Sequence, residues 1–279
     1  MCFDSIFFII FAVQIITLSV KVKDVIATLE RFAPLPLQDG FDNAGLQIGT
    51  TEDVEISGVL LCLDVTEAVI DEAIGKGFNM VVSHHPLLFH GLKKITDDSM
   101  VERCVRKAIK NDIIIYSAHT NLDNARGGVN FEIAKRIGLK DVEFLQPICR
   151  DGFEGGSGII GALVEPLNDM KFKDMLIDIF GAKHLTTNAL DGKEIKRVAL
   201  CGGAGDFLID EAIKKGADAF VTGEMHYHVY FGEEEKIKLY VMGHYESEQY
   251  TQQLLQTILN EKCKDLKTEI TTVLTNPVC

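Results

Sequence analysis

The sequence contains no long block of lysine or arginine, and acidic residues outnumber basic ones by 41 to 28. The formal charge of −13 at pH 7 gives the protein a negative field that repels phosphate backbones. Binding of nucleic acid through a basic patch is therefore not expected. The composition is otherwise that of a globular protein, since 47% of the 279 residues are hydrophobic and 25% are charged. A chain of this length can build a large core in one or two domains.

The cysteines lack the pattern of a disulfide framework. No C-x-x-C pair occurs, the total of seven is odd, and several cysteines lie in apolar segments. Buried thiols in a reducing compartment fit this pattern better, so we expect a cytoplasmic protein. The sequence also has no G-x-S-x-G turn and no H-E-x-x-H helix, and no histidine pattern near the cysteines indicates a thiol nucleophile.

No apolar run is long enough to cross a membrane. The strongest candidate, from Ile6 to Val20, is shorter than the roughly 18–20 residues of a membrane span, and the acidic Asp4 precedes it, unlike in a signal peptide. An amphipathic helix is expected directly afterwards, over 23–32. We interpret residues 1–20 as an apolar extension that is dispensable or results from a mis-called start codon. A weak membrane anchor is the alternative.

Two segments of the chain resemble each other without a gap. GVLLCLDVTEAVIDEAIGKGFNMVVS at 58–83 aligns with RVALCGGAGDFLIDEAIKKGADAFVT at 197–222. Each copy has the pattern strand, helix, glycine cap, strand. Further on, IIIYSAHTNLD at 113–123 corresponds to KLYVMGHYESE at 238–248, and each contains a histidine followed four residues later by a carboxylate. The chain is therefore expected to contain two related halves.

The alternation of strands and helices predicts an α/β fold with largely parallel sheets. The repeat divides it into a first α/β half at 21–140 and a second segment at 141–279, which contains the connection and the second α/β half. We expect the two to form a single functional unit with a site in the cleft between them.

Histidines and carboxylates follow the predicted strands of both halves. Ligands in α/β sheets bind at the carboxyl ends of strands, so these side chains are candidate metal ligands. A mixed set of imidazoles and carboxylates suits Zn²⁺, Mn²⁺, Fe²⁺, Co²⁺ or Ni²⁺ rather than Ca²⁺ or Mg²⁺ alone. The candidates are His84 and His85 after the strand at 80–82, His119 and Asp123 after the next strand, and His244 and Glu248 after the matching strand of the second half.

The adjacent pair His84 and His85 favours two ions over one, because neighbouring residues of a strand point to opposite faces. If a helix begins near His244, its imidazole and the carboxylate of Glu248 share one helix face. Glu248 is then placed to bridge two ions, with one histidine of the pair on each side. We therefore expect two divalent transition-metal ions per chain, zinc first among them. The alternative for an isolated histidine pair is a surface or hydrogen-bonding role.

The remaining histidines have less support as ligands. His119 is expected either to orient a ligand or to transfer protons, because its match in the repeat is a predicted ligand. His226 and His228 lie in TGEMHYH, where the second repeat replaces the histidine pair by Gly-Glu, and we expect them to line the same cleft without touching metal. His90 and His184 lack companions and are expected on the surface.

A glycine-rich turn, CGGAGD at 201–206, follows a strand and opens a helix. Free backbone N–H groups at Gly202, Gly203 and Gly205 would form a site for phosphate or carboxylate. The turn is neither a P-loop nor a full dinucleotide fingerprint. The alternative is a tight strand-to-helix turn that needs glycine for steric reasons.

Six ordered motifs resemble those of the Nif-three-like proteins, which are ring-forming proteins with a dinuclear metal centre and include homologues of GTP cyclohydrolase 1 type 2. The resemblance extends from about residue 21 to 277. It implies that His84, His85, Asp123, His244 and Glu248 are the ligands, with Glu248 bridging the ions. It also implies a homohexamer whose metal sites face an internal cavity. The motifs are FDNAGLQIG, SHHPLLF, SAHTNLD, CGGAGDFLIDEA, ADAFVTGEMHYH and GHYESE.

Two metal ions that share a water lower its pKa and make hydroxide available, so hydrolysis is the expected chemistry. In a GTP cyclohydrolase, hydroxide would attack C8 of the guanine ring and formate would be released. His119 or His228 would transfer protons, and the glycine turn would receive the triphosphate. The negative charge of the protein fits a triphosphate poorly unless metals and local donors offset it. The alternatives are a non-catalytic metal-binding hexameric scaffold or regulatory interaction protein, and a phosphoester hydrolase.

Overall fold

A computed structural model describes residues 19–50, 53–232 and 235–278. Most of the predicted apolar extension, residues 1–18, lies outside these ranges. Within the described ranges, no helix is both long enough and apolar enough to span a membrane.

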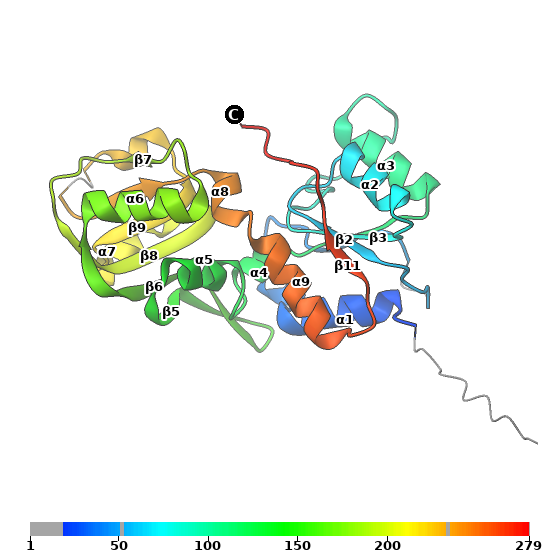
Figure 1. Cartoon of the computed structure of the whole chain (residues 1–279), viewed down its shortest axis with the longest axis horizontal. Helices are drawn as coiled ribbons and strands as arrows, with labels where there is room; N and C mark the ends of the chain where they lie inside the picture. Colours follow the sequence, from blue (N-terminus) through cyan, green and yellow to red (C-terminus); the bar gives the residue numbers. More distant parts are fainter. Residues whose placement is uncertain (1–18, 51–52, 233–234, 279) are drawn as a thin grey trace, which may run out of the picture.

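The chain forms two lobes, each built on one β-sheet, with helices α4, α5, α8 and α9 between them (Figure 1). The fold is mixed α/β, as predicted. The first sheet has the strand order β1 (Gly45–Ile48), β4 (Ile114–Ser117), β3 (Met80–Ser83), β2 (Val59–Cys62) and β11 (Thr268–Ile270). The second sheet has the order β5 (Lys140–Arg150), β6 (Phe153–Asn168), β8 (Glu194–Ala204), β9 (Ala219–Glu224), β10 (Lys238–Val241) and β7 (Thr186–Thr187).

The helices connect these strands and cover the sheets. Short 3-10 helices are η1 (Leu35–Leu37), η2 (Asp206–Leu208) and η3 (Tyr227–Tyr230). The α-helices are α1 (Val22–Phe32), α2 (Glu67–Gly75), α3 (Met100–Lys110), α4 (Thr120–Asp123), α5 (Val129–Ile137), α6 (Asp169–Phe180), α7 (Ile209–Lys214), α8 (His244–Glu248) and α9 (Thr251–Lys262).

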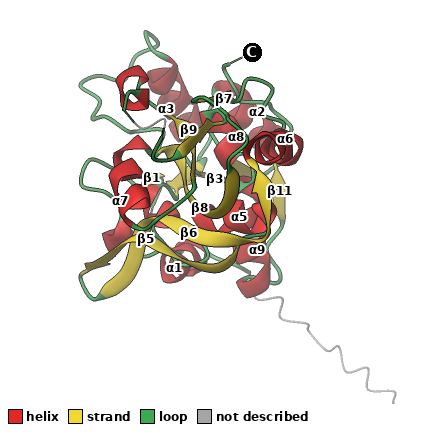
Figure 2. Cartoon of the chain, turned by 90° about the vertical axis from the view of Figure 1, so that its left-hand side faces the viewer, coloured by secondary structure: helices red, strands yellow, loops and turns green. Residues whose placement is uncertain are grey.

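The prediction of largely parallel sheets is correct for only part of the structure. In the first sheet, β2, β3, β4 and β11 are parallel and β1 is antiparallel. In the second sheet, β8, β9 and β10 are parallel, but β5, β6 and β7 pair in antiparallel fashion. The β5–β6 hairpin turns at Asp151 and Gly152, with φ of +52° and +83°, as a two-residue turn of this kind requires. Figure 2 views the molecule from the lobe that contains this hairpin.

Equivalent strands of the repeat occupy equivalent places in the two sheets. However, the strand pairing of the segments at 113–123 and 238–248 differs by one residue from their sequence alignment. Met80 lies beside Ile114 in the first sheet, and its match Ala219 lies beside Lys238 in the second. The ungapped sequence alignment instead matches Ile114 with Leu239. Since every residue of β4 is buried, alternation of apolar and polar residues gives no signal for the register of this strand.

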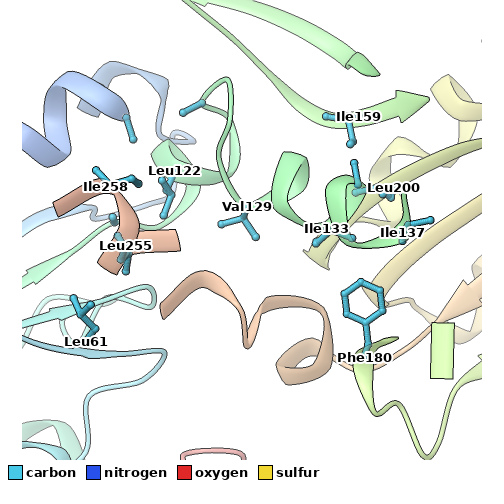
Figure 3. Packing of buried hydrophobic residues seen from close by; sticks show 14 of the residues in the cluster. Leu61, Leu122, Val129, Ile133, Ile137, Ile159, Phe180, Leu200, Leu255 and Ile258 are labelled. Atoms are coloured by element: carbon cyan, nitrogen blue, oxygen red, sulfur yellow. The ribbon is translucent and has the colours of Figure 1, made fainter. Parts of the chain in front are cut away.

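Alternate residues of the central strands enter different cores. In β2, Val59 and Leu61 face a core between the lobes, whereas Leu60 and Cys62 pack with residues of α2 and α3. Figure 3 shows the central core, in which Val129 and Ile133 of α5, among others, lie between side chains of the two lobes. The two lobes therefore share one continuous apolar core.

The last part of the chain returns to the first lobe. α9 packs against α1, and β11 then pairs in parallel with β2 (Figure 1). A helix does begin at His244, as considered above, but it is the short α8, which ends at Glu248, and α9 starts separately at Thr251.

Candidate metal centre

The five predicted metal ligands lie together between the two lobes. They stand where strands end, as expected for α/β sheets. The first lobe supplies three of these side chains and the second lobe supplies two. His84 and His85 directly follow β3, Asp123 is the last residue of α4, and His244 and Glu248 are the first and last residues of α8.

Glu248 lies at the centre of the five predicted ligands. Its buried carboxylate places Oε1 3.7 Å from His84 Nε2, and Oε2 lies 3.0 Å from His85 Nε2 and 3.1 Å from His244 Nε2. Asp123 Oδ1 lies 3.6 Å from the same nitrogen of His84. Two groups therefore share Glu248, one with His84 and Asp123 and the other with His85 and His244. The three donor atoms of each group lie within 4.8 Å of one another, which suits the binding of a metal ion.

A hydrogen bond on the far side of each imidazole directs its Nε2 atom toward Glu248. Each partner atom is an acceptor, so Nδ1 carries a proton in each ring and Nε2 is the ring nitrogen that faces the centre. Metal-binding histidines are oriented in this way. Nδ1 donates to the Ala118 carbonyl at 2.8 Å in His84, to Asp64 Oδ1 at 2.7 Å in His85, and to Glu224 Oε1 at 3.0 Å in His244.

The centre contains buried polar atoms that a cation would satisfy. Among the described residues, His84 Nε2 and Asp123 Oδ1 are buried without a hydrogen-bond partner. Such unpaired groups cost roughly 1–3 kcal/mol each. The donor set therefore fits a divalent metal ion, because positive charge between these atoms would pair both of them.

The pKa shifts of Asp123, Glu248 and His84 reflect their burial and the charges that surround them in the centre. Burial raises the pKa of Asp123 well above its usual range, and the neighbouring Glu248 raises it further. Burial acts on Glu248 in the same direction, but the imidazoles of His84, His244 and His85 outweigh it and hold the pKa of this carboxyl well below its usual range. Burial lowers the pKa of His84, which favours the neutral ring that a metal ion requires.

Two carboxylates that hold the imidazoles were not predicted from the sequence. Asp64 follows β2, and Glu224 is the last residue of β9. Glu224 occupies the position in the second repeat that corresponds to His85. The second half therefore uses a carboxylate at that position to orient His244, which is itself a predicted ligand.

The glycine-rich end of β8 does not offer the free backbone donors that an anion site needs. All three predicted N–H groups are already bonded to side chains of the protein, so the structure gives no support to the predicted anion site at these glycines. The N–H of Gly202 donates to Asn130 Oδ1 at 2.9 Å, that of Gly203 to Ser247 Oγ at 3.0 Å, and that of Gly205 to Thr222 Oγ1 at 3.0 Å.

Close packing explains glycine at this place. A Cβ atom at Gly203, whose φ is +61°, would lie 2.5 Å from Glu248 Oε1. A Cβ atom at Gly223 would lie 2.6 Å from Ser247 Oγ. The ends of β8 and β9 therefore let α8 approach closely, and this approach brings Glu248 to the centre.

His119 lies beside the cluster formed by the five predicted ligands, and a buried carboxylate holds its ring. Its ring centroid is 5.3 Å from that of His84 and 5.5 Å from that of His85. Its Nδ1 donates to Asp42 Oδ1 at 2.7 Å, and the backbone N–H of Thr120 donates to Asp42 Oδ2 at 3.0 Å. Burial alone would raise the pKa of Asp42, but hydrogen bonds from His119 and Thr120 lower it to about 2. Asp42 is therefore ionised at neutral pH and orients His119.

His228 does not join the cluster. It is exposed in η3, where its ring packs near those of Tyr227 and Phe231, and it is not one of the described residues that line the cavity beside the cluster. The structure therefore gives no support to its predicted role in proton transfer. His90 and His184 are exposed, as expected.

A cavity of about 1050 Å³ opens beside the cluster. Its lining includes His85, His119, Asp123, His244 and Glu248, so predicted ligands from both lobes face the same space. A volume of this size accommodates a small organic molecule.

These features define a two-lobed α/β protein with a shared, buried glutamate at a candidate metal centre between the lobes. The model of the Duf34/NIF3 family (NGG1p interacting factor 3) matches residues 20–277, and the chain belongs to this family. The resemblance found in the sequence motifs is thereby confirmed.

Known proteins are similar to this chain over most of its length. The GTP cyclohydrolase 1 type 2 homolog of Clostridium acetobutylicum is 34% identical over 233 residues, which cover 83% of this chain and 86% of that protein. The homolog of the same name from Clostridium perfringens is 35% identical over 229 residues, covering 82% and 87%. The crystal structure of a Bacillus cereus protein related to NIF3 is 26% identical, has a TM-score of 0.84, and covers 94% of this chain and 99% of that one.

Proposed function

We propose that the protein is a metal-dependent hydrolase with two divalent transition-metal ions, zinc first among the candidates, bound by His84, His85, Asp123, His244 and Glu248. The observation that carries this proposal is the division of the Glu248 carboxylate. Its Oε1 faces one group of donor atoms and its Oε2 faces the other. When bound, a pair of such ions lowers the pKa of water and supplies a nucleophile near neutral pH.

The residues around the cluster have distinct roles in this proposal. Asp64 and Glu224 hold two imidazoles in the tautomer that presents Nε2 to the centre. His119, held by Asp42 and lining the cavity, is the candidate for proton transfer to or from the substrate. The shared core between the lobes fixes the positions of these groups.

The reaction that we propose is hydrolysis of a C–N bond in a purine ring or a related heterocycle. The names of the curated relatives make GTP the first substrate to test. The proposal includes a cytoplasmic homohexamer. Four of the five described cysteines are buried free thiols, which supports a reducing compartment. Exposed aromatic residues, among them Tyr227 and Phe231, support self-association.

The first test is elemental analysis of tag-free protein purified anaerobically without chelator. The wild type is expected to contain about two transition-metal ions per chain, and the double variant His84→Ala/His85→Ala to lose them. His90→Ala/His184→Ala is the matched control, because both of its histidines are exposed and lie outside the cluster. Wild-type protein that stays metal-free after reconstitution would disprove the metal site.

The second test measures formate release from GTP by the metal-loaded protein. Release that is lost in Glu248→Gln, with an unchanged oligomer in light scattering, supports the hydrolase. Phosphate release in place of formate would identify a phosphoester hydrolase. A loaded protein that turns over neither bond would instead be a metal-binding scaffold or regulatory protein.

A further inference from the structure

Two phenylalanine rings lie between the solvent and the histidine cluster. Phe41 and Phe89 both line the cavity and are 68% and 39% exposed. Their ring centroids are 6.2 Å apart, and the ring of Phe89 is 6.1 Å from that of His119. The rings therefore lead from the outside of the cavity to the proposed site of proton transfer.

The two loops that carry these rings are held together without a ligand. Asn43 Nδ2 donates to the Leu88 carbonyl at 2.7 Å, and the Leu88 N–H donates to Gln47 Oε1 at 3.1 Å. The residue after Phe41 is Asp42, whose carboxylate is fixed by His119. The planes of the two rings lie at 62° to each other, so this fixed frame offers a flat ring one phenylalanine to stack on and a second to meet edge-on.

The charges of the cavity do not suit a phosphate. Arg150 is the one lysine or arginine among the described residues of the lining, and its guanidinium already donates to the Leu37 and Gln38 carbonyls and to Asp39 Oδ1. The lining also contains the carboxylates of Asp39, Asp123 and Glu248. The N–H groups of Gly202, Gly203 and Gly205 are bonded within the protein. Apart from bound metal ions and the histidines, a phosphate would therefore meet carboxylates and no unpaired lysine or arginine among the described residues of the lining.

We propose that this cavity recognises an uncharged, planar heteroaromatic ring of nucleobase size, which packs against Phe41 and Phe89, and that a triphosphate adds nothing to its binding. This inference rests on the proposed function, because it names the substrate class of the same site. Stacking on aromatic side chains tolerates different bases, since each base has a π-face. The ring edge then faces His119 and the cluster.

The test is calorimetric titration of the metal-loaded protein with guanosine, adenosine and GTP, and with tripolyphosphate as a competitor. Guanosine or adenosine is expected to bind, GTP to bind no more than threefold more tightly than guanosine, and tripolyphosphate not to displace the nucleoside. The competitor is needed because phosphates also coordinate metal ions. The inference is overturned if neither nucleoside binds, if GTP binds more than threefold more tightly, or if tripolyphosphate displaces the nucleoside.

Variants test the aromatic surface itself. Phe41→Leu and Phe89→Leu keep an apolar side chain but remove the ring, and each is expected to weaken nucleoside binding about tenfold. Phe153→Leu is the matched control, because Phe153 is 45% exposed in β6 and does not belong to the described lining. Metal content is measured for every variant. A change of less than threefold in both cavity variants, with full metal content, would rule out stacking on these rings.

The binding readout separates this inference from the proposed function. If the protein binds nucleosides through Phe41 and Phe89 but releases no formate, the inference about the aromatic surface stands and the hydrolase proposal fails. If the protein releases formate from GTP but depends on the triphosphate for binding, the hydrolase proposal stands and the inference about the aromatic surface fails.

Discussion

At the scale of single residues, the orientation of the His85 and His244 imidazoles depends on carboxylates that do not face the centre. Asp64 accepts from His85 Nδ1 at 2.7 Å and from Thr275 Oγ1 at 2.7 Å. Asp64→Asn removes the negative charge behind His85, and we expect metal affinity to fall by about tenfold or more. Competition with a fluorescent chelator measures this. Asp71→Asn is the control, since Asp71 is largely exposed and pairs with Lys107. Equal metal affinities in the two variants would show that Asp64 does not support the centre.

The residues of the candidate metal centre could be predicted from the sequence, whereas the carboxylates that orient its histidines and the neighbouring His119 could not. Adjacent histidines before a proline, and a histidine four residues before a carboxylate, are recognisable patterns within short segments. Asp42 and Asp64 are 77 and 21 residues away from the histidines they contact. Because the chain contains 41 acidic residues, nothing local distinguishes these two from the rest.

At the scale of elements, the glycine-rich end of β8 sets how closely α8 approaches. Gly203→Ala places a Cβ atom 2.5 Å from Glu248 Oε1, at a φ of +61°. Gly181→Ala has a similar φ of +66° but no heavy atom within 4 Å of the new Cβ. Both variants should lose about 1 kcal/mol of the free energy of unfolding from the backbone alone. Only Gly203→Ala is expected to lose metal as well, because it displaces Glu248.

Urea unfolding and elemental analysis of the two glycine variants measure these effects. Retention of full metal content by Gly203→Ala would mean that Glu248 has more freedom than its contacts indicate. Greater destabilisation of Gly203→Ala than of Gly181→Ala is expected in addition, since a steric contact is added to the strained backbone.

The elements themselves were predictable to different extents. The alternation of strands and helices predicted the α/β fold, because buried strands and amphipathic helices have different apolar periods, and the ungapped match of two segments identified the repeated units. The Asp151-Gly152 pair is a strong hairpin signal, yet the antiparallel β5–β6 pair was not predicted. The pairing of β11 with β2 connects residues about 200 positions apart in the chain, and no local pattern encodes such a partner.

At the scale of the whole molecule, the candidate metal centre lies across the contact between the lobes. Side chains from α5 and α9 already join the two sheets through one apolar core. Ligands from both lobes would add a second connection. Binding to the folded state alone stabilises it, by about 2.7 kcal/mol at a free ligand concentration of 100 times the dissociation constant.

Metal loading should therefore raise the melting temperature of the wild-type protein. For a chain of this size, 2.7 kcal/mol corresponds to a shift of about 5–10 °C, and a chelator should reverse it. Glu248→Gln is expected to abolish the shift, because the amide replaces the carboxylate that both groups of donors share. Glu246→Gln on the same helix, α8, is the control and should keep it, since Glu246 belongs to neither of these donor groups. Differential scanning calorimetry of the three proteins, each with and without metal, measures these shifts. A metal-dependent shift that persists in Glu248→Gln would show that the lobes are linked through other ligands and that Glu248 does not bridge the two ions.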